Sequence, residues 1–108
     1  MTSHIGEFEQ IVLLAVLQLK DEAYAISIRG RLKEYAQRRV TRGALYRTLD
    51  RMESKGLLRW AVHEPTQERG GHPRRCFEVT AGGIAALRSS RSALFKLWEG
   101  LEGTLGEP

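Results

Sequence analysis

The order of apolar periodicities along the chain constrains its fold more than any other feature of the sequence. Apolar residues first recur every three or four positions, which predicts helices at 7–19, 24–37 and 41–56. Apolar and polar residues then alternate, which predicts paired strands at 57–64 and 74–79. A further helical pattern predicts a long last helix from 80 to 103. The expected fold is mainly α-helical with a small β-hairpin.

Three helices followed by a two-stranded hairpin form the element order of a winged helix-turn-helix. With 108 residues, the chain is long enough for one such domain and not for two. We expect the winged helix-turn-helix DNA-binding domain at 5–80 and a long C-terminal dimerisation helix at 81–103. A domain of this size buries only about 60–65% of its unfolded surface, so a second subunit would help to cover the remainder.

Two of the predicted helices carry more apolar surface than one small domain needs. Leu14 and Leu17 make the first helix apolar nearly all round, which is typical of a helix that other elements or a partner subunit cover. The last helix has a short heptad seam, interrupted only by Arg91. We therefore expect a homodimer. Its predicted interface residues are Phe8, Val12, Ile84, Leu87, Leu94, Trp98 and Leu101.

Capping signals mark the ends of two helices. Thr41 and Thr80 are suited to cap the N-termini of the third and last helices, and Gly56 suits the position just after the third. Gly30, by contrast, lies inside the second helix, where glycine costs about 1 kcal/mol relative to alanine. We therefore expect close packing or slight strain at Gly30.

Positive charge is concentrated in one part of the chain. Seventeen Lys and Arg residues against thirteen Asp and Glu give a net charge of +4. The residues between 29 and 51 include eight cations, opposed only by Glu34 and Asp50. The cations are Arg29, Arg31, Lys33, Arg38, Arg39, Arg42, Arg47 and Arg51. Such segregation over a helix-turn-helix favours DNA as the partner. The alternative for any one arginine is a solvated helix face.

The third predicted helix is the candidate recognition helix, because an arginine-rich outer face fits a major groove about 12 Å wide. Arg42 and Arg47 would each reach a guanine edge or a phosphate. Arg51, farther along, would contact DNA or remain solvated. Tyr46 would donate its hydroxyl to a phosphate or pack at the edge of the core. Thr41, as the cap, would help the helix N-terminus to position a phosphate.

Basic residues on both sides of this helix extend the predicted DNA-binding surface. Arg38 and Arg39 lie in the turn before it, where contact with phosphates is the natural role. The hairpin contributes Arg69, His72 and Arg74, which suit a probe of the minor groove or the phosphates. The alternative is a surface loop whose charges only aid solubility.

Three segments of the chain resemble the PadR family. The segment 41–58, TRGALYRTLDRMESKGLL, is similar to the family's recognition helix, with its Leu-Tyr pair, a following Leu and a terminal Glu-x-x-Gly-Leu. RRCFEVT at 74–80 is similar to the family's return strand, Arg-Lys-Tyr-Tyr-x-Leu-Thr, and YAISI at 24–28 resembles its Tyr-Gly-x-x-Ile helix start. The resemblance covers about residues 8–102. Departures from the pattern are Arg47 for proline, Ala44 for threonine, Ala25 for glycine and Cys76 for tyrosine.

The resemblance implies a homodimeric transcriptional repressor that binds an inverted-repeat operator in double-stranded DNA. It also implies a candidate effector site, since some short-tailed members bind flat aromatic drugs between paired tryptophans. Trp98 and Phe95 would form such a site for a small aromatic or hydrophobic effector. The alternative is that both residues pack at the dimer interface. The departures from the pattern leave the operator sequence open.

Other kinds of chemistry find little support in the residues. No catalytic Ser/His/Asp order, phosphate-cradling glycine loop or metal-binding helix motif is present, so we expect no enzyme, no cofactor and no metal. A single cysteine, Cys76, excludes a framework of disulfides within the chain. Cys76 would either pack in its strand or act as a redox switch, in which case the neighbouring Arg75 would lower the pKa of its thiol. The longest apolar run has seven residues, so we expect a cytoplasmic protein without membrane contact. A protein–protein interaction module without DNA binding is the alternative function.

Overall fold

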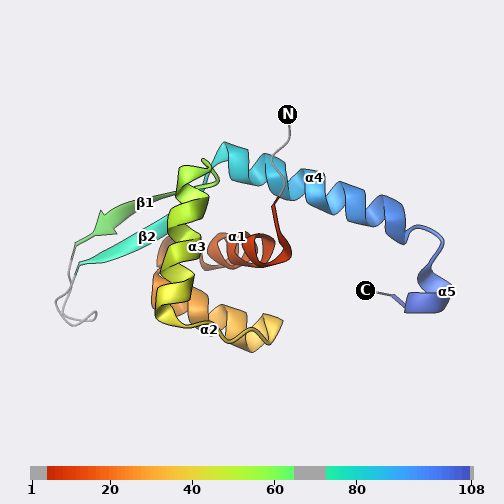
Figure 1. Ribbon diagram of the computed structural model, residues 1–108, viewed down its shortest axis with the longest axis horizontal. Helices are drawn as coiled ribbons and strands as arrows, with labels where there is room; N and C mark the ends of the chain where they lie inside the picture. Colours follow the sequence, from red (N-terminus) through yellow and green to blue (C-terminus); the bar gives the residue numbers. More distant parts are fainter. Residues whose placement is uncertain (1–4, 65–72, 108) are drawn as a thin grey trace.

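The computed structural model describes residues 5–64 and 73–107 of the chain. Its elements, in chain order, are α1 (Glu7–Leu19), a short 3-10 turn η1 (Lys20–Glu22), α2 (Ala25–Ala36), α3 (Arg42–Ser54), β1 (Leu58–His63), β2 (Arg74–Val79), α4 (Ala81–Trp98) and α5 (Glu102–Leu105). The predicted mainly helical fold with one antiparallel hairpin is confirmed (Figure 1). Within the described parts of the chain, no helix is long and apolar enough to cross a membrane.

The threonine side chains that the sequence predicts as N-caps do cap α3 and α4. The Thr41 hydroxyl accepts a hydrogen bond from the Ala44 amide at 3.1 Å, and the Thr80 hydroxyl accepts one from the Gly83 amide at 3.0 Å. After α3, Gly56 adopts a φ of 76°, in the left-handed region that glycine tolerates. The backbone therefore turns directly from α3 into β1.

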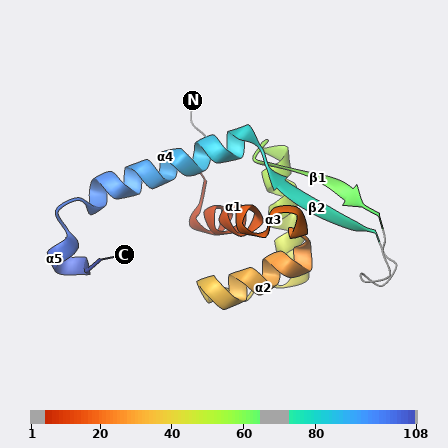
Figure 2. The same cartoon turned by 180° about the vertical axis from the view of Figure 1, so that it is seen from behind.

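The core forms around α1, which lies between α4 and α2 and is crossed by α3 (Figures 1 and 2). Helices and hairpin all contribute side chains that are almost completely buried. These include Val12, Leu13, Ile28, Leu32, Leu45, Leu49, Met52, Leu58 and Phe77. Val12 has no exposed surface in the single chain. The expectation that Val12 lies at a subunit interface is therefore wrong, because it packs inside its own chain.

The hairpin is joined to the start of α2 as well as to the core. β1 and β2 pair antiparallel with Trp60 opposite Phe77, and both side chains pack with the core cluster. The Phe77 amide donates a hydrogen bond to the Ala23 carbonyl at 2.9 Å. The segment before α2 therefore borders the outer edge of β2, which fixes the hairpin beside α2. The predicted contact residues Arg69 and His72 lie outside the described residues.

α4 leaves the rest of the fold after its first turns (Figure 1). Its buried residues, Gly83 and Ala86, both lie near its start. Large apolar side chains farther along remain exposed. These are Leu94, Phe95, Leu97 and Trp98 on α4, and Leu101 and Leu105 beyond it. α4 ends at Trp98, and the chain turns at Gly100, where φ is 83°. The prediction of one helix continuing to residue 103 is wrong at this turn, which takes Leu101 off the seam.

Glycine packing differs from the prediction. A Cβ added at Gly30 would meet no atom within 4 Å, and Gly30 does not have a positive φ. The expected close packing or strain at Gly30 is therefore wrong. Close packing occurs instead at Gly83, where an added Cβ would collide with the Leu57 carbonyl oxygen. The start of α4 is thus packed directly onto the backbone at the start of the hairpin.

Candidate nucleic-acid interface

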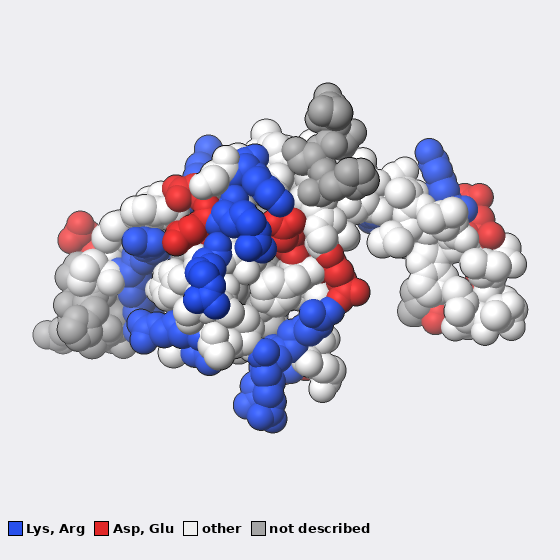
Figure 3. All heavy atoms as spheres, in the orientation of Figure 1, with Lys and Arg blue, Asp and Glu red and all other residues white. Residues whose placement is uncertain are grey.

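The outer face of α3 carries the arginines that the sequence predicts to meet DNA. Leu45 and Leu49 are fully buried on the inner face, which leaves Arg42 and Arg47 exposed on the outside near the helix N-terminus. The Arg47 guanidinium bends back over the first turn, since its Nη1 would lie 3.5 Å from a Cβ at Gly43. Lys and Arg side chains gather over α3 and below it towards α2 (Figure 3).

A groove of about 680 Å³ lies between the N-terminal halves of α2 and α3 and the loop end of the hairpin, where β2 begins. It brings together three of the predicted contact residues, Arg42, Tyr46 and Arg74. Tyr46 both packs against the core and lines the groove, so its two predicted roles are compatible in this geometry. Arg29 and Arg75 add two further cations to the walls. The groove is therefore suited to an anionic ligand.

Ile26 is a groove residue that the sequence analysis does not single out. It is a large aliphatic residue, yet 68% of it is exposed, and it lines the groove beside α3. Helical phase could have identified it, because Ala25, Ile28 and Leu32 define a buried face that excludes position 26. An exposed isoleucine among arginines is suited to apolar contact with a sugar or a thymine methyl group.

Polar contacts hold the loop end of the hairpin beside α2 and α3. The Tyr24 hydroxyl and His63 Nδ1 lie 2.8 Å apart, and the Arg74 guanidinium lies 5.5 Å from the centroid of the Tyr24 ring. Arg75, the next residue of β2, forms an ion pair with Asp50 on α3, with 3.8 Å between Arg75 Nη1 and Asp50 Oδ1. Cation–π and ionic contacts of this kind restrict where the arginines point. Arg74 and Arg75 are thereby held at the groove.

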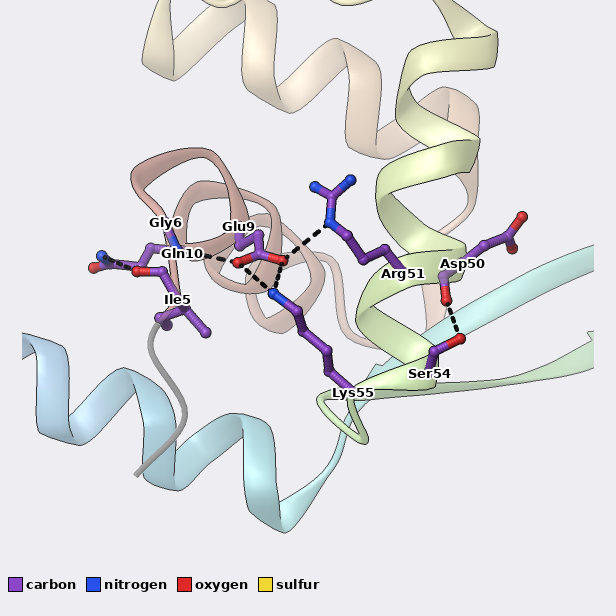
Figure 4. A network of polar contacts seen from close by, with 8 residues as sticks. All are labelled: Ile5, Gly6, Glu9, Gln10, Asp50, Arg51, Ser54 and Lys55. Atoms are coloured by element: carbon purple, nitrogen blue, oxygen red, sulfur yellow. Dashed lines mark hydrogen bonds and ion pairs between the residues drawn. The ribbon is translucent and has the colours of Figure 1, made fainter. Parts of the chain in front are cut away.

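The other end of α3 is tied to α1 through Glu9, which is 6% exposed (Figure 4). Lys55 Nζ lies 3.0 Å from Glu9 Oε2, and Arg51 Nε lies 3.5 Å from the same oxygen. The Gly6 amide donates a hydrogen bond to the other carboxylate oxygen at 3.1 Å. The predicted DNA contact by Arg51 would have to compete with this ion pair.

The same contacts set the protonation state of Glu9. Burial by itself raises its pKa, but the hydrogen bond from Gly6, the bond and charge of Lys55 and the bond from Arg51 together outweigh burial. The pKa of Glu9 therefore lies below its usual value, and the carboxylate is ionised at neutral pH. An ionised Glu9 keeps Lys55 and Arg51 directed towards α1.

The two arginines in the turn between α2 and α3 differ in whether an acidic side chain of the protein is paired with them. Arg38 forms an ion pair with Glu7 on α1, whereas Arg39 is exposed and has no acidic partner within residues 5–64 and 73–107. The Thr41 hydroxyl is engaged as the N-cap of α3, as predicted. Arg39 is thus the more available of the two turn arginines for an external phosphate.

Cys76 is a packing residue in this structure. Its side chain is buried, and its thiol donates a hydrogen bond to the Asp21 carbonyl at 3.3 Å. Burial raises the pKa of the Cys76 thiol, and the charges of Asp21, Glu22 and Glu78 raise it further. The hypothesis that Arg75 lowers the pKa of this thiol is therefore wrong. Among the described residues, no cluster of three His, Cys, Asp or Glu side chains could hold a metal.

The combination of these features defines the class of protein. A helix-turn-helix presents an arginine-bearing helix, a β-hairpin lies beside it as a wing, and a basic groove separates the two. This is the geometry of a winged helix-turn-helix, in which the exposed helix enters the major groove of DNA. The class is that of the DNA-binding transcriptional regulators.

Comparison with known proteins places the chain within this class. Residues 13–89 match the transcriptional regulator PadR-like family, and the chain belongs to it. A PadR-like transcription factor from Bacteroides fragilis is 32% identical, with a TM-score of 0.69 over 89% of this chain and 87% of that chain. A PadR family regulator from Clostridium difficile R20291 is 23% identical and shares the fold, with a TM-score of 0.71 over 92% and 99% of the two chains. Among curated proteins, none matches this chain.

Proposed function

We propose that this chain is a homodimeric transcriptional repressor of the cytoplasm that binds an inverted-repeat DNA operator. The observation that carries the proposal is the groove between α3 and the wing, where Arg42, Arg74 and Arg75 converge. The function is regulatory and requires no catalytic group. Family membership supports the class, and the arginines in the groove support DNA as the ligand.

DNA would be recognised by the N-terminal half of α3. Arg42 and Arg47 are exposed there and would contact guanine edges or phosphates in the major groove. Tyr46, also on α3, and Arg74, across the groove on β2, would contact the backbone of the same duplex. In a dimer, two α3 helices would enter successive major grooves about 34 Å apart, which requires an operator with two inverted half-sites.

The dimer would form through apolar surface on α1 and α4. A groove of about 340 Å³ lies between these helices and is lined by Leu14, Leu17, Ile84 and Leu87 together with polar residues. Leu94 and Trp98 extend the apolar surface along α4 and are about half exposed. A single soluble domain rarely leaves such a row uncovered, and a second copy offers a matching row by symmetry. Leu14 and Leu17 therefore replace Val12 in the proposed interface.

A small aromatic effector is a finer element of the proposal. Phe95 and Trp98 are 60% and 40% exposed, and pairing of two α4 helices would bring two copies of each together. A planar ligand held there would change DNA affinity only if it favoured one angle between the two winged domains over another. Titration of a planar dye, followed through tryptophan fluorescence, tests this element, and Trp98→Leu should abolish the response.

Selection of bound sequences from a random duplex pool, followed by anisotropy titration, tests the function. The selected sequence should contain an inverted repeat and should bind more tightly than a scrambled duplex of equal length. Arg47→Ala should weaken binding to the selected sequence far more than binding to the scrambled one, whereas Lys96→Ala on α4 serves as the matched control. A protein–protein interaction module, the alternative function, would bind neither duplex even at low salt.

A further inference from the structure

A second basic hollow lies next to the DNA groove but outside it. Its volume is about 360 Å³, between α2 and the turn that precedes α3. It is lined by Arg29, Gly30, Lys33, Arg38, Arg39 and Val40. Arg29 lines both this hollow and the groove beside the wing, so the two concavities are neighbours. Four of the six lining residues are cations, and none is acidic.

Most of this positive charge has no acidic partner among residues 5–64 and 73–107. Arg38 is paired with Glu7, but neither Lys33 nor Arg39 has an acidic partner in the described part of the chain. The Arg29 Nε donates a hydrogen bond to the Val40 carbonyl at 3.1 Å. That bond orients the guanidinium and leaves its two terminal amino groups available. Three cations therefore face one hollow with unused donors.

Gly30 forms part of the wall of this hollow and lacks a structural explanation elsewhere. It lies in the interior of α2, where glycine destabilises a helix relative to alanine. An added Cβ would meet nothing within 4 Å, so neighbouring atoms do not require glycine. The open space beside its Cα is space that a ligand can use to approach the helix backbone closely.

We propose that this hollow binds a phosphate group. Guanidinium and ammonium donors converging on one concavity match the charge and geometry of phosphate oxygens. The phosphate would belong either to the DNA backbone or to a free phosphorylated molecule. The first source rests on the proposed function, because the hollow includes the turn directly before the recognition helix. Arg29, Lys33 and Arg39 supply the donors, and Gly30 supplies the room.

The DNA source is tested by the salt dependence of binding. Affinity for a random duplex is measured by anisotropy over a range of salt concentrations for the wild type, Lys33→Gln and the control Lys96→Gln. Loss of one phosphate contact should reduce the magnitude of the slope of log affinity against log salt by about 0.9. The control, on the distant α4, should keep the wild-type slope.

The free-phosphate source is tested without DNA. Inorganic phosphate is titrated at constant ionic strength against chloride, and binding is followed by ³¹P NMR and by the thermal midpoint. A phosphate-dependent rise in the midpoint that Lys33→Gln abolishes supports a free ligand. Gly30→Leu places a bulky side chain of a good helix former on one wall of the hollow. The variant should remain folded and should show a weaker response than the wild type in the assay to which the wild type responds.

The outcomes separate this proposal from the function on which it builds. If the wild type binds no duplex, the proposed function fails, and the phosphate titration alone decides the hollow. If the wild type binds DNA but Lys33→Gln keeps its salt slope, and phosphate has no effect, the hollow is not a phosphate site.

Discussion

Replacing Gly83 by alanine is the most direct perturbation of the joint between α4 and the hairpin. A Cβ at this position would lie 2.6 Å from Val79 Cγ1 and closer still to the Leu57 carbonyl oxygen. Carbon atoms in good contact are about 3.5–4.0 Å apart, so the new methyl group cannot be accommodated without movement. The Leu57 carbonyl also accepts a hydrogen bond from the Thr80 amide at 3.1 Å, and this bond resists the movement.

The expected effect of Gly83→Ala follows from two opposing contributions. Overpacking of a rigid site costs about 1–3 kcal/mol, and a backbone oxygen that is already bonded favours the upper end. Alanine in place of glycine regains up to about 1 kcal/mol of helix propensity. The net loss of unfolding free energy is therefore about 2 kcal/mol, which for a domain of this size lowers the midpoint by roughly 8–16 °C.

Urea and thermal unfolding measure this loss, at one fixed protein concentration because the stability of the proposed dimer would depend on concentration. Gly30→Ala is the matched control, since it makes the same chemical change inside a helix where nothing lies within 4 Å. The control should stabilise the protein by up to about 1 kcal/mol. A Gly83→Ala variant as stable as the wild type would refute the packing argument.

Three further predictions concern Glu9, Cys76 and Leu94. Glu9→Gln should lower stability at neutral pH by about 1–3 kcal/mol. The pKa of Glu9 is lower in the folded protein than in the unfolded chain, where it is about 4.3, so the stabilisation by Glu9 is complete above that value and is lost as pH falls through the folded pKa. The difference in unfolding free energy between variant and wild type, measured in urea, should therefore disappear at low pH. A difference that does not change with pH would contradict this reasoning. Alkylation of Cys76 by iodoacetamide should be far slower in native protein than in urea at mildly alkaline pH, and equal rates would show an accessible thiol. Leu94→Glu should produce monomers in sedimentation at micromolar concentration, whereas an unchanged mass would place the interface elsewhere.

The fold could be predicted because its elements are defined by short-range patterns. In α3, three apolar positions at helical spacing predict a single buried face, and Leu45, Leu49 and Met52 are all fully buried. In the hairpin, apolar and polar residues alternate at 57–64, and this segment forms the predicted strand β1, which pairs with the predicted return strand β2. A residue's own neighbours in sequence carry enough information for these assignments.

Two of the features that the sequence analysis missed, the Glu9–Lys55 contact and the burial of Val12, depend on residues far apart in the chain. Lys55 and Glu9 are 46 positions apart, so no local pattern indicates that the last turn of α3 is bound to α1. Val12 has the same apolar character whether a core or a partner covers it, and only the position of α1 between α2 and α4 decides the question. The turn at Gly100, which ends the seam at Trp98, had a local signal, because a glycine just after the last periodic residue is typical of a helix C-terminus.

These long-range contacts hold one end of α3 and leave the other exposed. At the C-terminal end, α1 contributes the Glu9 carboxylate to Lys55, and the Thr80 hydroxyl at the start of α4 donates to the Gly56 carbonyl at 2.5 Å. At the N-terminal end, Arg42 faces the groove. Because α4 begins beside the anchored end of α3, we expect a rotation of α4 to be transmitted to α3 at that end. In the proposed dimer, a change in the angle between the two α4 helices would then alter the spacing of the two α3 helices, on which binding to the proposed two half-sites depends.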